Sequence, residues 1–340
     1  MQKLIRIGTR DSQLAVWQAT LVQNHLKESG VSSELVYIKS EGDIDTVTPL
    51  YALGVQGIFT KTLDAALLNN RIDIAVHSMK DVPTQLAKGI QQAAVLKRGS
   101  HKDILVFHPE FSKRNTPFTI TYDSLTQSGS KTKEESWSIS LREHAGKPGM
   151  PEDIVIATSS IRRIAQWLNK YPSHKIENLR GNVNTRLRKL KESNWHGAVF
   201  AAAGLERINL RPENSMDLDW MLPAPAQGAI MIVCRENDHD SFEFCQALNH
   251  DHTALCTKIE RDFLNTLMGG CSTPISALAE IKKNKIFFSG NLCSKNGQLE
   301  SRVSAELPLE NAPTLGVRMA NQILQQPTAS KVLQDIRYEK

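Results

Sequence analysis

Four polar side chains follow directly on an alternating apolar run at residues 72–76, a pattern that is typical of a buried β-strand. They are His77, Ser78, Lys80 and Asp81. In open α/β sheets, ligand sites form at the carboxyl ends of buried strands. Asp81 is the one carboxylate of this group, and it could accept hydrogen bonds from N–H donors, stabilise a cation or exchange a proton. On this run alone, the alternative is a strand end whose polar residues simply reach water.

Three turns that lead into predicted helices carry hydroxyl groups and arginines. Exposed N–H groups and the helix dipole favour an anion at such a turn, and guanidinium groups add charge-assisted hydrogen bonds. The residues are Arg10 and Ser12 in the first turn, Thr158, Ser160, Arg162 and Arg163 in the second, and Arg180 and Arg186 in the third. Arg186 falls in the first turn of its helix, where its charge opposes the dipole, so we expect it to interact with a group outside the helix, such as a ligand. For the first turn alone, the alternative is an ordinary capped helix.

The chain has five cysteines, and one of them has unusual neighbours. All five lie in the last third of the sequence and none forms a C-x-x-C pair, which argues against a disulfide framework and against a zinc site. Cys271 follows Gly269 and Gly270 at the end of a predicted helix, so its thiol would be sterically open. The alternative is a pair of helix-capping glycines before a buried thiol.

The composition is that of an ordinary globular protein, with 40% apolar and 23% charged residues in 340. The formal net charge of +5 fits a protein that binds anions but does not indicate nucleic acid. No apolar stretch is long enough to span a bilayer, and the N-terminus lacks the pattern of a signal peptide. We therefore expect a cytoplasmic protein with no metal and no membrane or nucleic-acid partner.

Strands and helices alternate in the first hundred residues and again from about residue 150, which predicts two α/β units with parallel strand pairing. Between them, residues 108–149 are rich in Ser, Thr, Lys and Glu, which indicates a surface insertion. The last part combines a helix near 253–267 with strands near 286–288 and 302–305. It predicts a small α+β domain.

Taken together, these motifs closely resemble the porphobilinogen deaminase family, also called hydroxymethylbilane synthases. Seven matching segments occur in the order that the family has, and they span nearly the whole chain except the insertion. They are Thr9–Ser12, His77–Pro83, Thr158–Arg163, Leu179–Val183, Ala203–Arg207, Pro223–Ala229 and Gly269–Cys271.

The resemblance implies a three-domain fold, with two domains like type II periplasmic binding proteins and a third α+β domain. The implied boundaries are 1–106 with 229–247 for the first domain, 107–149 for the insertion, 150–228 for the second domain and 248–340 for the third. The implied reaction joins four porphobilinogen molecules head to tail, releases ammonia and yields the linear tetrapyrrole hydroxymethylbilane. Growth is implied to start on a dipyrromethane cofactor that a thioether attaches to Cys271. A monomer is implied as well.

The resemblance also implies roles for the residues. Each pyrrole carries an acetate and a propionate, so the arginines would bind carboxylates, with about 1.5–3 kcal/mol for each charge-assisted contact. The residues implied to hold the cofactor are Cys271, Ser78, Lys80, Thr158, Ser160, Arg162, Arg163 and Arg186, and those implied for substrate are Arg10, Ser12, Arg180 and Arg207. Loss of ammonia leaves a cationic azafulvene, which Asp81 would stabilise while it handles the departing protons.

Three departures from the family pattern are visible. Ala52 and Gln56 stand near positions where the family usually has lysines, Ala226 replaces a usual glycine, and the insertion is longer than expected. Two other functions compete with the enzyme: a two-lobed module that binds a carboxylated ligand without chemistry, and a nucleic-acid-binding protein. The module gives no reason for the Gly-Gly-Cys turn, and nucleic-acid binding is supported only by the net charge and the basic helix at 186–191.

Overall fold

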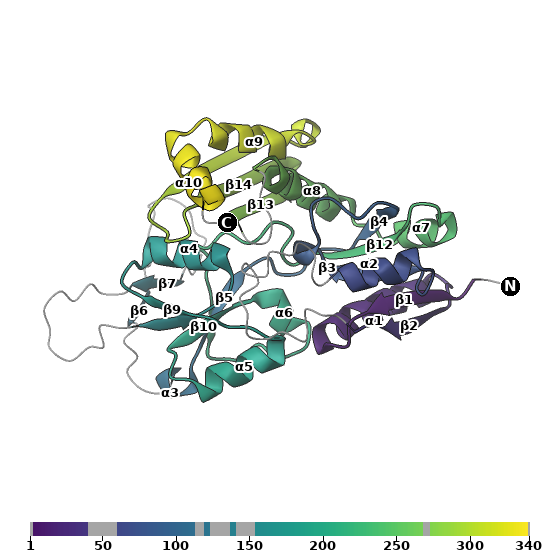
Figure 1. The fold of residues 1–340 in the computed structure, drawn as a ribbon, viewed down its shortest axis with the longest axis horizontal. Helices are drawn as coiled ribbons and strands as arrows, with labels where there is room; N and C mark the ends of the chain where they lie inside the picture. The colour runs from purple at the N-terminus through teal and green to yellow at the C-terminus, as the bar shows by residue number, and fades with distance from the viewer. Residues whose placement is uncertain are drawn as a thin grey trace, which may run out of the picture.

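A computed structural model describes residues 3–39, 60–112, 119–122, 137–140, 154–267 and 273–338. Three bodies surround a centre, as Figure 1 shows: one lobe built on the first sheet, a second lobe opposite it, and a third domain that lies against both. The predicted fold class is confirmed as two α/β lobes and a smaller α+β domain.

The first sheet has five strands, and its central strand β3 carries the predicted catalytic group at its end. In spatial order they are β2 (Ser33–Tyr37), β1 (Ile5–Thr9), β3 (Ile74–Ser78), β12 (Ile230–Arg235) and β4 (Ile90–Val95). The strands β1, β2 and β3 are parallel, and β12 runs antiparallel to β3 and β4. The helices of this lobe are α1 (Gln13–Glu28), α2 (Lys61–Leu68) and α7 (His239–Gln246).

Apolar residues cover both faces of β3. Ile74 and Val76 pack in the same cluster as α1, whereas Ala75 packs with residues of α2 on the other face. A strand that is covered on both faces needs apolar residues at successive positions, not only at alternate ones. The alternation predicts that Ile72 lies on the same face as Ile74. In the structure, Ile72 precedes the strand and packs in the cluster that contains Ala75.

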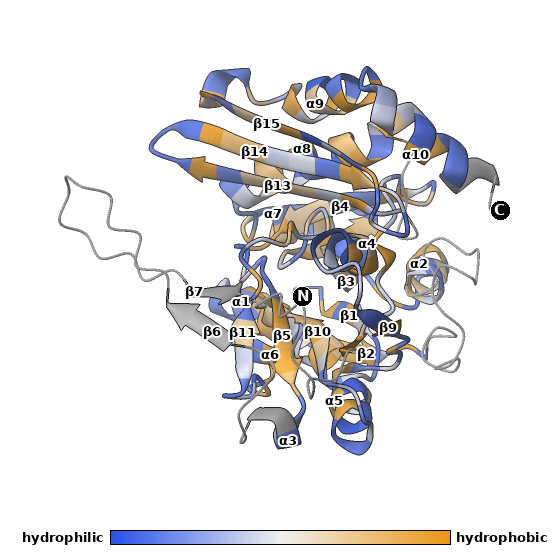
Figure 2. Ribbon diagram, turned by 90° about the vertical axis from the view of Figure 1, so that its left-hand side faces the viewer, coloured by the Kyte–Doolittle hydropathy of each residue, from blue (hydrophilic) through white to orange (hydrophobic). Residues whose placement is uncertain are grey.

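The second sheet repeats this architecture. Its order is β11 (Ser215–Asp217), β5 (Asp103–Phe107), β10 (Gly197–Ala201), β8 (Val155–Ala157) and β9 (Lys175–Glu177). The helices are α4 (Ile161–Lys170), α5 (Val183–Glu192) and the short α6 (Ala202–Glu206). Figure 2 shows β5 and β10 as largely apolar strands, while much of α5 is hydrophilic.

The strand β5 belongs to the second sheet. It pairs with β10 and β11, whereas the predicted limits place residues 103–106 in the first domain and Phe107 in the insertion. The domain limits stay predictions. In the described parts of the insertion, α3 (Pro109–Ser112) precedes two paired strands, β6 (Thr119–Tyr122) and β7 (Trp137–Ser140).

The third domain is an antiparallel sheet covered by helices. Its strands are β13 (Ile275–Lys282), β14 (Lys285–Cys293) and β15 (Glu300–Pro308), and its helices are α8 (Asp251–Thr266), α9 (Leu315–Leu324) and α10 (Pro327–Tyr338). A single apolar cluster, with Phe263 against Phe288, joins the helices to the sheet. Within the described ranges, none of the helices has both the length and the apolar character needed to cross a membrane.

The two lobes are joined by two chain crossings, which the third domain holds together. Gly99 N donates to Gly228 O at 3.0 Å, linking the crossings to each other. Glu260 of α8 is fully buried and accepts hydrogen bonds from Arg98 on one crossing and from Ala226 N on the other, both at 2.6 Å. Ala226 has a φ of 62°, a conformation that costs an L residue about 1–2 kcal/mol, so its bond to Glu260 helps hold a strained position.

The buried Glu260 generates a stability prediction. The change Glu260→Gln removes the charge that pairs with Arg98 and leaves an amide NH₂ facing backbone donors, so the free energy of unfolding should fall by about 3–5 kcal/mol. The apparent unfolding midpoint in urea measures this. Glu306→Gln, which removes an exposed partner of Lys285, serves as the control and should change the stability by less than about 1 kcal/mol. Equal midpoints for the two variants would show that Glu260 does not hold the crossings together.

Candidate active site

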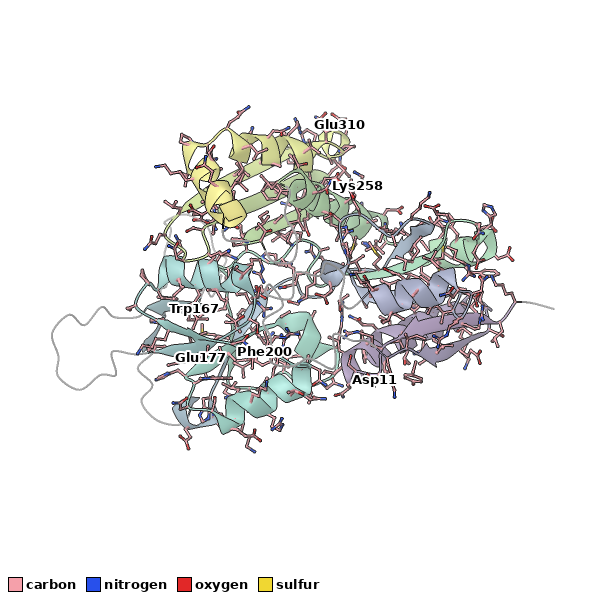
Figure 3. The ribbon with its side chains drawn as sticks, viewed as in Figure 1. Asp11, Trp167, Glu177, Phe200, Lys258 and Glu310 are labelled. Atoms are coloured by element: carbon pink, nitrogen blue, oxygen red, sulfur yellow. The ribbon has the colours of Figure 1, made fainter. Side chains whose placement is uncertain are left out.

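A cavity of about 770 Å³ lies between the two lobes, and the third domain contributes to its lining. Asp11 and Phe200, both labelled in Figure 3, mark its two sides: Asp11 belongs to the first lobe and Phe200 to the second. Leu264, Thr273 and Ile275 come from the third domain. The predicted site residues in the lining are Arg10, Ser12, Ser78, Lys80, Asp81, Thr158, Ser160, Arg162, Arg163, Arg180 and Arg186. Folding therefore brings together residues that are up to 176 positions apart in the sequence, from Arg10 to Arg186.

Asp81 ends a short 3-10 helix, Met79–Asp81, that follows β3 directly. Met79 is buried, and its backbone N–H donates to Ala229 O of the neighbouring chain segment at 3.0 Å, which fixes the start of the turn. The carboxylate of Asp81 lines the cavity and has neither a hydrogen bond nor an ion pair with the part of the chain that the structure describes. A cavity-facing carboxylate in this position is available to a ligand.

Lys80 lies beside Asp81 and faces the same cavity. Burial lowers the pKa of Lys80 to about 8, and the positive charge of Arg163 lowers the pKa further, while the negative charge of Asp81 opposes the change. Lys80 Nζ contacts Gln227 Oε1 at 3.5 Å. The ammonium group therefore has only a long hydrogen bond to Gln227, and it can lose its proton close to neutral pH.

A buried carboxylate that the motif analysis missed, Asp103, organises the second basic turn. Its Oδ1 accepts from Arg163 Nη2 at 2.7 Å and from Gln227 Nε2 at 2.9 Å, and its Oδ2 pairs with Arg162 Nη2 at 2.7 Å. Burial alone would raise the pKa of Asp103, but the two guanidinium groups hold it at about 2. Asp103 is thus a second acid near the arginines, in addition to Asp81.

The two arginines beside Asp103 differ in the N–H donors that remain available to a ligand. All three nitrogens of Arg163 donate to Asp103 or to Val199 O. Arg162 donates through Nη1 to Leu222 O at 2.6 Å, but its buried Nε has no hydrogen-bond partner among the described residues. Arg162 therefore keeps a donor for a ligand, whereas Arg163 contributes its charge and holds Asp103.

The third basic turn adds Arg186 to the cavity. Asn182 caps α5 by accepting from Thr185 N at 2.9 Å, which sets the start of the helix. Arg186 Nε donates to Gly181 O at 2.7 Å, so the side chain folds back over the turn. Burial and the charges of Arg163 and Arg180 lower the pKa of Arg186 to about 10, so it stays charged at neutral pH. Its position against the helix dipole agrees with an interaction outside the helix.

The predicted hydroxyl groups are partly committed to the fold. Ser78 Oγ bonds with the buried Gln18 of α1 at 2.9 Å, and Thr158 Oγ1 accepts from Ser160 N at 3.3 Å. Ser159, which was not singled out, ties the second turn to the third because its Oγ accepts from Leu179 N at 3.0 Å. These contacts set the geometry of the basic turns.

Two predicted residues are not in the described cavity lining. Arg207 donates to Gly228 O at 2.6 Å and lies over the ring of Trp17, 5.8 Å from its centroid. Its side chain links the second lobe to a chain crossing and to α1, and its predicted contact with substrate stays a prediction. Cys271 lies outside the described residues, as do Ala52 and Gln56.

The charge of the lining is strongly positive. Six cationic side chains face the cavity, together with the carboxylates of Asp11 and Asp81. The cationic residues are Arg10, Lys80, Arg162, Arg163, Arg180 and Arg186. Over the described ranges, there is no group of three His, Cys, Asp or Glu side chains placed to hold a metal ion. The arrangement can bind a ligand with several carboxylates and can place one acid–base group beside it.

Comparison with known proteins agrees with this arrangement. Residues 5–243 match the family model described as "Porphobilinogen deaminase, dipyromethane cofactor binding domain", and residues 254–325 match "Porphobilinogen deaminase, C-terminal domain". The chloroplastic porphobilinogen deaminase of Oryza sativa is 40% identical over 90% of this chain and 79% of its own length. The porphobilinogen deaminase of Pelotomaculum thermopropionicum is 36% identical over 100% of this chain and 99% of its own length, and that of Desulforamulus reducens is 33% identical over 99% of both. The chain belongs to the porphobilinogen deaminase family.

Proposed function

We propose that the chain condenses porphobilinogen head to tail into hydroxymethylbilane at this cavity, and that growth starts on a dipyrromethane attached to Cys271. The observation that carries the proposal is the charge imbalance at the second basic turn. Arg162 and Arg163 are both buried, and Asp103 is the carboxylate that they share. Because an uncompensated buried charge is costly, this turn is suited to an anionic ligand group.

The residues present fit the dipyrromethane. Its carboxylates would accept hydrogen bonds from donors such as the buried Nε of Arg162, which has no partner among the described residues. Thr273 lines the cavity and stands two residues after Cys271, which limits the separation of their Cα atoms to about 7.6 Å. When bound, this group supplies a pyrrole carbon as the nucleophile and a fixed anchor for growth.

The side chains of the cavity then divide the work between binding and chemistry. Arg10, Arg162, Arg180 and Arg186 bind carboxylates at the periphery of the rings. Asp81 accepts hydrogen bonds from pyrrole N–H groups and stabilises the positive charge that develops as ammonia leaves the substrate. It also accepts the proton that the attacking ring carbon releases. Arginine cannot do this, because it repels the cation and does not exchange protons near neutral pH.

The expectations of a cytoplasmic monomer without nucleic-acid or membrane partners stay predictions, as do the roles of the individual residues. A binding module without chemistry would share the basic cavity. It would not need a cavity-facing carboxylate beside Lys80 that makes no hydrogen bond with the described residues.

Asp81→Ala should remove nearly all turnover of porphobilinogen, by at least about 10²–10⁴-fold, because the change removes both the proton acceptor and the negative charge. Asp81→Glu should keep a small fraction, since it retains a carboxylate at a displaced position. Steady-state release of product measures both, with circular dichroism to confirm folding. Asp219→Ala, at an exposed partner of Lys102, is the control and should keep full activity. Wild-type rates in Asp81→Ala would refute the assignment.

Cys271→Ser should abolish the covalent adduct, because an alcohol does not replace a thiol as the nucleophile that captures the electrophile. Intact-protein mass of the purified chain measures this directly, and Ser272→Ala is the neighbouring control that should keep the adduct. An adduct of unchanged mass on Cys271→Ser would show that the attachment lies elsewhere.

The lowered pKa of Lys80 predicts that kcat/KM depends on pH. This pKa is about 8, so the ammonium form that attracts carboxylates is present below pH 8 and is lost as the pH rises above it. The ratio kcat/KM should therefore fall above about pH 8, since this ratio reports groups of the free enzyme. Lys80→Arg stays charged and should shift that decline to higher pH, so the difference between the two profiles isolates Lys80 from titration of the substrate. Superimposable profiles would exclude Lys80 from binding.

A further inference from the structure

The turn that carries Asp81 is held from its far side by the third domain. Arg261 of α8 donates through Nη1 to Val82 O at 2.9 Å and through Nη2 to Pro83 O at 2.6 Å. The same Nη1 lies 3.5 Å from Met79 O. One guanidinium group therefore contacts backbone carbonyls on both sides of Asp81.

A second contact lies one helical turn further along α8. Thr84 Oγ1 donates to Asn265 Oδ1 at 3.2 Å. Arg261 and Asn265 are four positions apart, so they lie on the same face of the helix, and that face follows the chain from Met79 to Thr84. The segment after Asp81 thus runs along α8 rather than through solvent.

The other side of the turn is fixed by the first sheet. Ser78 ends β3 opposite Ile230, and Met79 N donates to Ala229 O. A 3-10 helix of three residues has little internal hydrogen bonding of its own, so contacts at its two ends determine where Asp81 lies. Arg261 supplies the contact at the C-terminal end.

We propose that Arg261 is a positioning residue, which sets the place of the Asp81 carboxylate in the cavity by fixing the carbonyl groups around it. The inference rests on the proposed role of Asp81. The planar fork of a guanidinium group suits two adjacent carbonyls in a way that a single ammonium group does not. A displacement of a reacting group by about 1 Å can cost about 10²-fold in rate, so the effect should appear in turnover rather than in binding.

The test uses the full chain with its covalent adduct, verified by intact mass. Arg261→Gln should lower kcat for porphobilinogen by about 10- to 100-fold while KM changes by less than about threefold. Arg261→Lys keeps the charge and one donor nitrogen but loses the planar fork, so its kcat should fall between those of Arg261→Gln and the wild type. Lys258→Gln is the matched control on the same helix: Lys258, labelled in Figure 3, is exposed and pairs with Asp262 of its own helix, so kcat should not change.

A double-mutant cycle separates positioning from general destabilisation. If Arg261 acts through Asp81, then Arg261→Gln should cost less than about threefold when it is made in the Asp81→Glu enzyme, whose carboxylate is already displaced. The same loss in both backgrounds would overturn the proposal, and so would kcat values within twofold of the wild type for both Arg261 variants. If Arg261→Gln does not fold, Arg261→Lys takes its place in the cycle under the same criteria. A wild-type enzyme that shows no turnover at all would refute the proposed function and, with it, this inference.

Discussion

Asp103 sets the electrostatics of the cavity by sharing one negative charge between two buried arginines. Its two oxygens orient Arg162 and Arg163, and Gln227 connects the same carboxylate to Lys80, the neighbour of Asp81. Full neutralisation would leave no attraction for an anionic ligand, and no neutralisation would make folding costly. The single carboxylate leaves a net positive charge in a buried place, so the cavity attracts carboxylates while its arginines hold a fixed geometry.

The third domain contacts both the chain crossings and the turn that carries Asp81. Two successive residues of α8 reach different parts of the first lobe and its connections: Glu260 holds the chain crossings, and Arg261 holds the turn of Asp81. Ala226 lies at one of these crossings with a positive φ, where a glycine would carry no penalty. The Ala226 N–H donates a hydrogen bond to Glu260, which helps hold the alanine in this conformation. The same helix therefore links the geometry of the chain crossings to the geometry of the turn that carries Asp81.

The local motifs were sufficient to predict most of the fold and the cavity, because strand ends and helix starts carry recognisable residue types. Arg162 and Arg186 could be found in this way, since each stands in a short turn with hydroxyl or glycine neighbours. Asp103 could not, because it begins a strand in a run of apolar residues and its partners lie 59 and 60 positions away. Arg261 could not be found either, because it donates to backbone carbonyl groups, which every residue has. Arg207 shows that a matching motif does not fix a contact: its side chain donates to the backbone of a chain crossing, and its role in substrate binding stays a prediction.

A crystal structure of the protein isolated with its covalent dipyrromethane would show whether the cavity binds the ligand as proposed. We expect a ligand carboxylate within hydrogen-bonding distance of Arg162 Nε, with the Arg162–Asp103 pair intact, and the Asp81 carboxylate facing a pyrrole N–H. Ligand carboxylates bound away from the basic turns would contradict this arrangement, and so would an Asp81 that points out of the cavity while the pyrrole nitrogens bond to other groups.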